Sequence, residues 1–134
     1  MKAKSASMQV FEPFVRQWAA LLTTYRRDGT PVGTAVSIAV EGDHAFFRTY
    51  HTAGKAKRLR NNPVVEIAPS TMLGKPTGPA VHARAQLLSG EEARHAARSL
   101  HRTYPLFQGV LVRLGHRLMR FKTLHYELTP VAEG

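Results

Sequence analysis

The residues best suited to bind a charged ligand lie in one segment, residues 46–70, which reads FFRTYHTAGKAKRLRNNPVVEIAPS. A strand is expected to end at Thr49-Tyr50, and a short helix is expected to begin near Ala53. The first backbone N–H groups of a helix have no partner within the helix, and the helix dipole favours negative charge at that end. The segment therefore predicts an anion site at the start of this helix.

The side chains of the first helical turns suit the same ligand. Gly54 has no side chain, so an anion can approach the backbone closely. Lys55 places a full positive charge in the first turn, where its interaction with the positive end of the helix dipole costs roughly a few tenths of a kcal/mol. Charge-assisted hydrogen bonds from Lys55 to a phosphate, at about 1.5–3 kcal/mol each, would exceed that cost. Lys57 and Arg58 extend the basic surface. The alternative is a solvated basic helix face, and the spacing alone does not choose between them.

Other chemical motifs are absent or weak. The chain has no cysteine, which excludes disulfides, a thiolate nucleophile and cysteine-ligated metals. No two histidines are spaced i, i+2 on an expected strand or i, i+4 on an expected helix, so no metal site is predicted; they are His44, His51, His82, His95, His101, His116 and His125. Neither a nucleophile elbow nor a Walker-type phosphate loop is present. Such a chain fits an enzyme whose cofactor carries the chemistry.

Composition bounds the class of protein. The 134 residues fit a single domain over residues 1–134, and the 43% hydrophobic content is enough for a core. Nineteen Lys and Arg against nine Asp and Glu give a formal charge of +10, which attracts nucleic acid, an anionic membrane or a small anionic ligand. No signal-peptide core and no apolar stretch of about 20 residues is seen, so a cytoplasmic protein is expected.

The expected elements are mostly strands separated by turns. Strands are predicted over residues 18–25, 31–41, 44–50, 64–69, 80–88 and 122–129, with a tight turn at Asp28-Gly29. Helices are predicted over residues 8–17, 52–62, 89–104 and 106–119, the second with Thr52 as N-cap and Pro63 after its end. This order predicts a mostly β fold, a six-stranded antiparallel barrel capped by helices.

Several motifs together resemble a known family. They are Phe46-Phe47, Thr49-Tyr50, Ala53-Gly54-Lys55, Leu59, Asn62-Pro63 and Val64-Val65, with the hairpin of residues 25–31 and the closing HYELTP of residues 125–130. Over about residues 10–130 the chain resembles the pyridoxamine 5′-phosphate oxidase-like family of flavin-binding split β-barrels. The resemblance implies the split-barrel fold and a homodimer, with the cofactor in a cleft between subunits and residues 67–79 lining it from the partner.

Departures from the family pattern bear on the cofactor. Ala53 and Gly54 stand where oxidase members use Ser and Arg on the FMN phosphate, and Tyr50 replaces Asn. In these features the chain is similar to the branch that uses the deazaflavin coenzyme F420, which carries a phosphate and an oligoglutamate tail. A basic rim with Lys57, Arg58 and Lys75 would suit that tail.

The resemblance also gives a role to the second expected strand. Its residues 33, 35, 37 and 39 form a face of small side chains, and Gly33, Thr34 and Ala35 would offer a flat surface to a tricyclic ring. The alternative is that a tapering barrel interior needs small residues there. The implied cofactor-binding set is Gly33, Thr34, Ala35, Thr49, Tyr50, Thr52, Ala53, Gly54, Lys55, Lys57 and Arg58. No catalytic side chain is identified.

The function implied is a coenzyme F420-dependent oxidoreductase that transfers a hydride between the reduced cofactor and a small organic acceptor. An FMN-dependent oxidase or reductase of the same fold, or a cofactor carrier without turnover, would use the same site. A basic nucleic-acid-binding barrel is disfavoured because Phe46 and Phe47 point to opposite strand faces and form no stacking platform. The basic face of residues 106–120 is interpreted as solvated, so neither nucleic acid nor a membrane is expected as a partner.

Overall fold

A computed structural model describes residues 10–15, 19–50, 53–103 and 123–131. The predicted helix over residues 106–119 lies outside the described residues, as does most of the predicted N-terminal helix. What is described of the latter is a short 3-10 helix, η1 (Glu12–Phe14), with Pro13 in its first turn.

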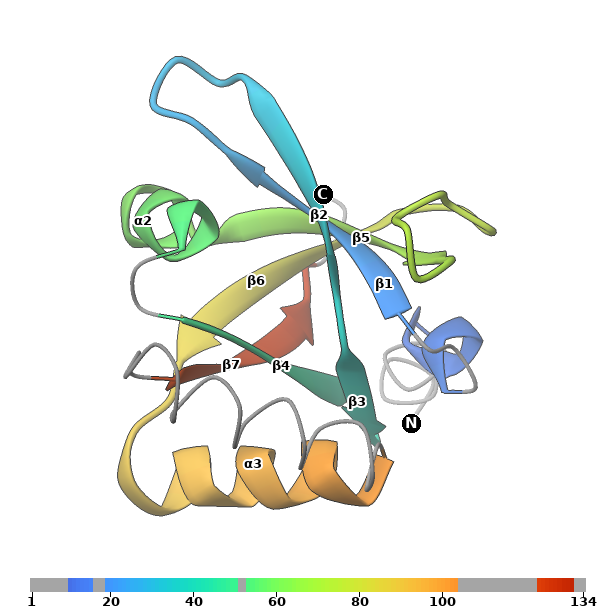
Figure 1. Cartoon of the computed structure of the whole chain (residues 1–134), viewed down its shortest axis with the longest axis vertical. Coiled ribbons are helices and arrows are strands. Elements are labelled where there is room, and N and C mark those ends of the chain that lie inside the picture. Colours follow the sequence, from blue (N-terminus) through green and yellow to red (C-terminus); the bar gives the residue numbers. More distant parts are fainter. Residues whose placement is uncertain (1–9, 16–18, 51–52, 104–122, 132–134) are drawn as a thin grey trace.

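The strands form one antiparallel sheet that curls into a half-barrel (Figure 1). In chain order they are β1 (Ala19–Tyr25), β2 (Pro31–Val36), β3 (Ile38–Glu41), β4 (His44–Tyr50), β5 (Val64–Ser70), β6 (Val81–Leu87) and β7 (Thr123–Pro130). Their order in the sheet is β2-β1-β5-β6-β7-β4-β3, so the two end strands are neighbours in the chain. The split β-barrel fold predicted from the sequence is confirmed.

The prediction differed in the strand over residues 31–41, which is two strands and not one. β2 pairs with β1, whereas β3 pairs with β4 at the other end of the sheet, and Ser37 separates them. A sheet closes when a strand bends and changes partner at a corner. The break at Ser37 lets this chain do so, which raises the strand count from six to seven.

The interior of the barrel is apolar, and a second apolar layer lies outside it. Alternate residues of each strand point inward, and Phe47 stacks on Tyr126 with ring centroids 5.0 Å apart. On the outer face Phe46, Ala39 and Leu88 pack against α3 (Gly90–Thr103) through Ala96 and Leu100. Helix α3 thus covers β3, β4 and β7 and leaves the other side of the barrel to α2 and the β1–β2 hairpin (Figure 1).

Helix α2 (Gly54–Asn61) caps one end of the barrel with its buried residues Ala56 and Leu59. It is shorter than the predicted 52–62, and its N-cap is Ala53, so the expected cap at Thr52 is wrong. At the other end, the Asn62 side-chain oxygen accepts the Val64 N–H at 3.0 Å and turns the chain into β5. The β1–β2 hairpin projects beside α2 (Figure 1), and Gly29 at φ +88° allows its tight turn.

Among the described residues, no helix is long and apolar enough to cross a membrane.

Candidate functional site

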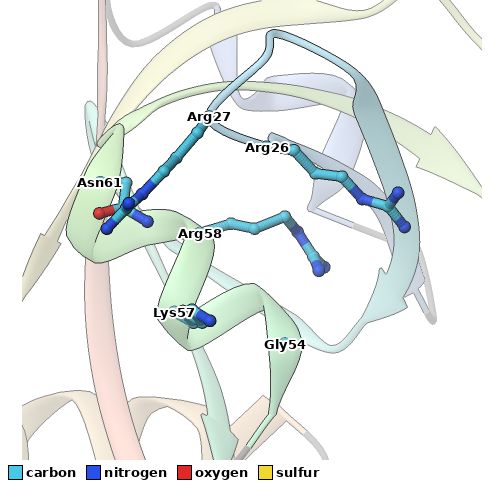
Figure 2. Close-up of a pocket in the computed structure, with 6 residues that line it drawn as sticks. All are labelled: Arg26, Arg27, Gly54, Lys57, Arg58 and Asn61. Carbon is cyan, nitrogen blue, oxygen red and sulfur yellow. The ribbon is translucent and has the colours of Figure 1, made fainter.

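A pocket of about 400 Å³ lies between α2 and the turn of the β1–β2 hairpin (Figure 2). It is lined by Arg26, Arg27, Gly54, Lys57, Arg58 and Asn61. Four of these six side chains are cationic, and no carboxylate is among them. Because like charges lie together with no acid between them, an anion in this pocket would relieve repulsion and gain several donors at once.

Arg58 is the side chain that crosses this pocket. Figure 2 shows it running from α2 into the space between the helix and the hairpin. Its Nε donates a hydrogen bond of 2.6 Å to the hydroxyl oxygen of Thr24, which is fully buried near the end of β1. A Cβ atom at residue 54 would lie 2.8 Å from Arg58 Nη1, so the missing side chain of Gly54 makes room for the guanidinium. The space above Gly54, expected to be open to a ligand, holds the Arg58 side chain.

At the start of α2, the backbone N–H groups of Gly54 and Lys55 have no acceptor among the described residues. Ala53 makes no side-chain cap, and the first turn contains no acidic residue. The Ala56 N–H bonds to the Ala53 carbonyl at 3.1 Å. A guanidinium carries only donors, so Arg58 adds to the positive potential here and cannot satisfy a backbone N–H group.

Lys55 is half-buried in the first turn of α2. Loss of water around the ammonium lowers the pKa of Lys55, and the neighbouring charge of Arg58 lowers it further. Both causes disfavour the charged form in the free protein. A bound anion would act in the opposite sense, so the electrostatics of Lys55 favour a negatively charged ligand.

The structure brings part of the predicted site together. Gly54, Lys57 and Arg58 line the pocket, and Lys55 shares their helix turn. Thr49 and Tyr50 form the last two residues of β4, just before this turn. Lys75 belongs to the loop between β5 and β6, and Figure 1 shows that loop on the opposite side of the barrel from α2, so within one chain Lys75 does not join the basic rim.

The predicted residues of β2 lie apart from the pocket. Gly33 and Ala35 are exposed on the outer face of the barrel, whereas Thr34 points inward with a buried hydroxyl that has no hydrogen-bond partner among the described residues. None of the three lines the α2 pocket. The small side chains at 33 and 35 therefore form an outer surface and do not fill a tapering interior; Ala39, by contrast, is buried under α3.

Three pocket residues and their buried support were missed from the sequence. Arg26 and Arg27 directly precede Asp28-Gly29 in the hairpin turn, and Asn61 is the last residue of α2. Thr24 is part of the barrel interior. The adjacent arginines before Asp28-Gly29 were the one available signal, but turn arginines are commonly solvated. Only the tertiary structure shows that the turn meets a helix about thirty residues further along the chain.

No group of three His, Asp or Glu side chains that could hold a metal ion occurs within residues 10–15, 19–50, 53–103 and 123–131.

Comparison with known proteins places the chain in a family. The profile of the family described as pyridoxamine 5′-phosphate oxidase matches residues 8–123. The chain belongs to the pyridoxamine 5′-phosphate oxidase family. No curated protein matches it in sequence.

Solved structures share the fold at low sequence identity. An F420-H2 dependent reductase (FDR-A) aligns with a TM-score of 0.60 and 14% identity over 83% of this chain and 93% of that one. The heme storage protein HutZ of Vibrio cholerae has a TM-score of 0.65 and 17% identity, with 92% of each chain covered. A conserved hypothetical protein of Mycobacterium tuberculosis has a TM-score of 0.66 and 20% identity over 98% of this chain and 81% of that one. These neighbours differ in what they bind, so they establish the fold alone.

Proposed function

We propose that this member of the pyridoxamine 5′-phosphate oxidase family binds coenzyme F420 and serves as a deazaflavin-dependent reductase. The observation that carries the proposal is the pocket at the start of α2, with four cationic side chains, no carboxylate and the half-buried Lys55 beside it. When bound, the deazaflavin supplies a hydride to a small electrophilic acceptor. The protein's own part is to bind, orient and shield the cofactor.

The phosphate of the cofactor is assigned to the first turn of α2. No side-chain cap for the backbone N–H groups there is found among the described residues, and Lys55 lies on the same turn. These groups together provide donors, dipole and charge for a dianion. Thr49 and Tyr50 precede this turn at the end of β4 and are assigned to the same end of the cofactor.

The number of cations favours F420 over FMN. One phosphate would be held by the helix start and Lys55, which leaves Arg27 and Lys57 for further anionic groups. Arg26 lies beside them and is also near the Asp28 carboxylate. An oligoglutamate tail supplies further carboxylates for the cationic side chains of the helix and the hairpin that line the pocket (Figure 2). Electrostatic complementarity of this kind fixes ligand choice and speeds association.

The ring of the cofactor is assigned to the outer face at Gly33 and Ala35. Both residues are exposed and small, and the Leu21 side chain and Gly74 of the loop after β5 border the surface that a planar ring would use. We propose that a second subunit closes this cleft, as the resemblance to the family implies, with the loop of residues 71–79 lining it from the partner. Exclusion of water would then protect the hydride from loss.

A parallel titration with F420 and FMN tests the cofactor. The protein should change F420 fluorescence with a submicromolar to micromolar dissociation constant and bind FMN more weakly. Lys55→Ala should weaken F420 binding about tenfold or more, by the loss of charge-assisted hydrogen bonds. The matched control is Arg98→Ala, which removes the same charge from the exposed face of α3.

The remaining outcomes identify the competitors. Protein purified with bound FMN, or tighter binding of FMN than of F420, would move the assignment to a flavin enzyme. Tight F420 binding with no oxidation of reduced F420 across a panel of acceptors would make the protein a carrier. Unchanged affinity in Lys55→Ala would show that the phosphate is wrongly placed.

A further inference from the structure

Thr24 is a buried hydroxyl in an otherwise apolar row of β1. Its inward neighbours on the same strand, Ala20 and Leu22, belong to the core, and all three side chains are fully buried. A buried polar group is costly without a hydrogen bond. The partner found for Thr24 among the described residues is Arg58, which is 34 positions away in the sequence and on another element.

This bond determines how the guanidinium is oriented. Arg58 has five N–H donors in one plane, and the bond to Thr24 engages the one on Nε. The donors on Nη1 and Nη2 are left for another partner, and no ion pair links Arg58 to a carboxylate within the described part of the chain. Gly54 leaves the space that this orientation needs, since a Cβ there would meet Nη1 at 2.8 Å.

We propose that Thr24 is a positioning residue that holds Arg58 so that its two terminal amino groups bind one anionic group of the ligand in a bidentate manner. The inference deepens the proposed function and rests on it for the identity of the ligand, whose phosphate or tail carboxylates both match a guanidinium fork. Arg58 becomes the residue that selects for the geometry of the anion, whereas the exposed Lys57 contributes charge without a fixed direction.

The arrangement has little value for the fold alone. A valine at position 24 would have nearly the same shape and no hydroxyl to satisfy, and Arg58 would then be free to extend into solvent. Holding a long side chain in one rotamer costs conformational entropy. If the guanidinium of Arg58 is already oriented, less side-chain conformational entropy is lost when an anion binds, which strengthens binding.

The experiment combines a double-mutant cycle with a direct probe of Arg58. The variants are Thr24→Val, which removes the acceptor, Thr24→Ser, which keeps it, Arg58→Lys, which keeps the charge without the fork, and the double variant Thr24→Val/Arg58→Lys. Each is titrated with inorganic tripolyphosphate and with F420, and its thermal unfolding is recorded. In the wild-type protein, proton exchange at Arg58 Nε is compared by NMR with that at Arg26 and Arg27.

The proposal expects a specific pattern. Thr24→Val and Arg58→Lys each weaken tripolyphosphate and F420 binding about tenfold, the double variant loses no more than either single one, and Thr24→Ser stays within about twofold of wild type. The Arg58 Nε–H exchanges more slowly than those of Arg26 and Arg27. If Thr24→Val does not fold, the Thr24→Ser and Arg58→Lys comparisons and the exchange measurement still test the assignment.

Contrary results separate this inference from the proposed function. Unchanged binding in Thr24→Val, additive losses in the double variant, or fast exchange at Arg58 Nε would overturn the role of Thr24 even where F420 binds tightly. A protein that binds neither F420 nor FMN, yet shows the full pattern with tripolyphosphate, would remove the proposed cofactor and retain the oriented anion site. Binding of no probe at all would refute both.

Discussion

Replacing Gly54 by alanine should separate anion binding from stability. The ideal Cβ would lie 2.8 Å from Arg58 Nη1, whereas ordinary contacts fall at 3.4–4 Å, so the guanidinium must move by about 0.6–1.2 Å. A shift of that size along the bond from Nε to the Thr24 hydroxyl would lengthen it from 2.6 Å to roughly 3.2–3.8 Å, at or beyond the limit of a hydrogen bond.

The two consequences of Gly54→Ala have opposite signs. Leaving the Thr24 hydroxyl with a poor partner costs about 1–3 kcal/mol, while replacing a helical glycine recovers about 0.4–1 kcal/mol. The far end of an arginine moves easily, so we expect the lower part of the first range and a net change in unfolding free energy of about 1 kcal/mol or less. Binding loses a charge-assisted contact of about 1.5–3 kcal/mol, which is a ten- to hundredfold weaker affinity for F420.

The assay is a fluorescence titration with F420 and chemical denaturation of wild type, Gly54→Ala, Arg58→Ala and the double variant. In the Arg58→Ala background there is no guanidinium to displace, so adding the methyl group should change the affinity less than twofold. If Gly54→Ala weakens binding equally with and without Arg58, the glycine serves the close approach of the ligand to the backbone. In that case the reasoning from Arg58 is refuted.

Two further predictions concern ionisable groups. Burial and Arg58 lower the pKa of Lys55, so the charged form of this side chain is disfavoured in the folded protein. Lys55→Met should therefore raise the unfolding temperature of the free protein at pH 7 while weakening F420 binding, and equal stability at pH 7 would contradict this. The stability difference between the variant and the wild type should shrink as pH rises through the lowered pKa of Lys55. Burial and Arg48 lower the pKa of His125, so as pH falls the unfolded chain binds a proton at this residue before the folded protein does. The unfolding free energy should therefore decrease as pH falls below about 6.5. In urea titrations, His125→Gln should flatten the dependence of the unfolding free energy on pH below about 6.5, and an unchanged slope would rule His125 out as its source.

The barrel was predictable because its strands carry strong local patterns. The Asp28-Gly29 turn specifies one local structure, and β4 (His44–Tyr50) has the predicted bounds. The break at Ser37 was not predictable in this way. Residues 31–41 keep one alternation throughout, and the change of partner from β1 to β4 depends on how the whole sheet closes.

The site was predictable in part, for a related physical reason. Charge and helix geometry are local, so the start of α2 and the cations at 55, 57 and 58 follow from the sequence. The second wall of the pocket comes from the hairpin turn and depends on where the helix packs. The helix cap also failed as a local prediction, because the observed N-cap Ala53 has no side-chain acceptor. Among the described residues no side chain caps α2, so the N–H groups of Gly54 and Lys55 are the ones offered to a ligand.

The shape of the basic surface bears on which anion it selects. A nucleic-acid-binding protein spreads its cations along a strand or groove, and its affinity depends steeply on salt because many phosphates are contacted. Here the two arginines of the hairpin and the cations of α2 face a single pocket of about 400 Å³. A pocket of that size falls within the range that encloses small ligands. The orientation of Arg58 also favours a small ligand, because the hydrogen bond from its Nε to a buried hydroxyl fixes the direction of one guanidinium. Such a bond does not increase the overall positive potential that attracts a polyanion. Concentrated charge with an oriented fork therefore favours a compact ligand bearing several anionic groups over an extended polymer.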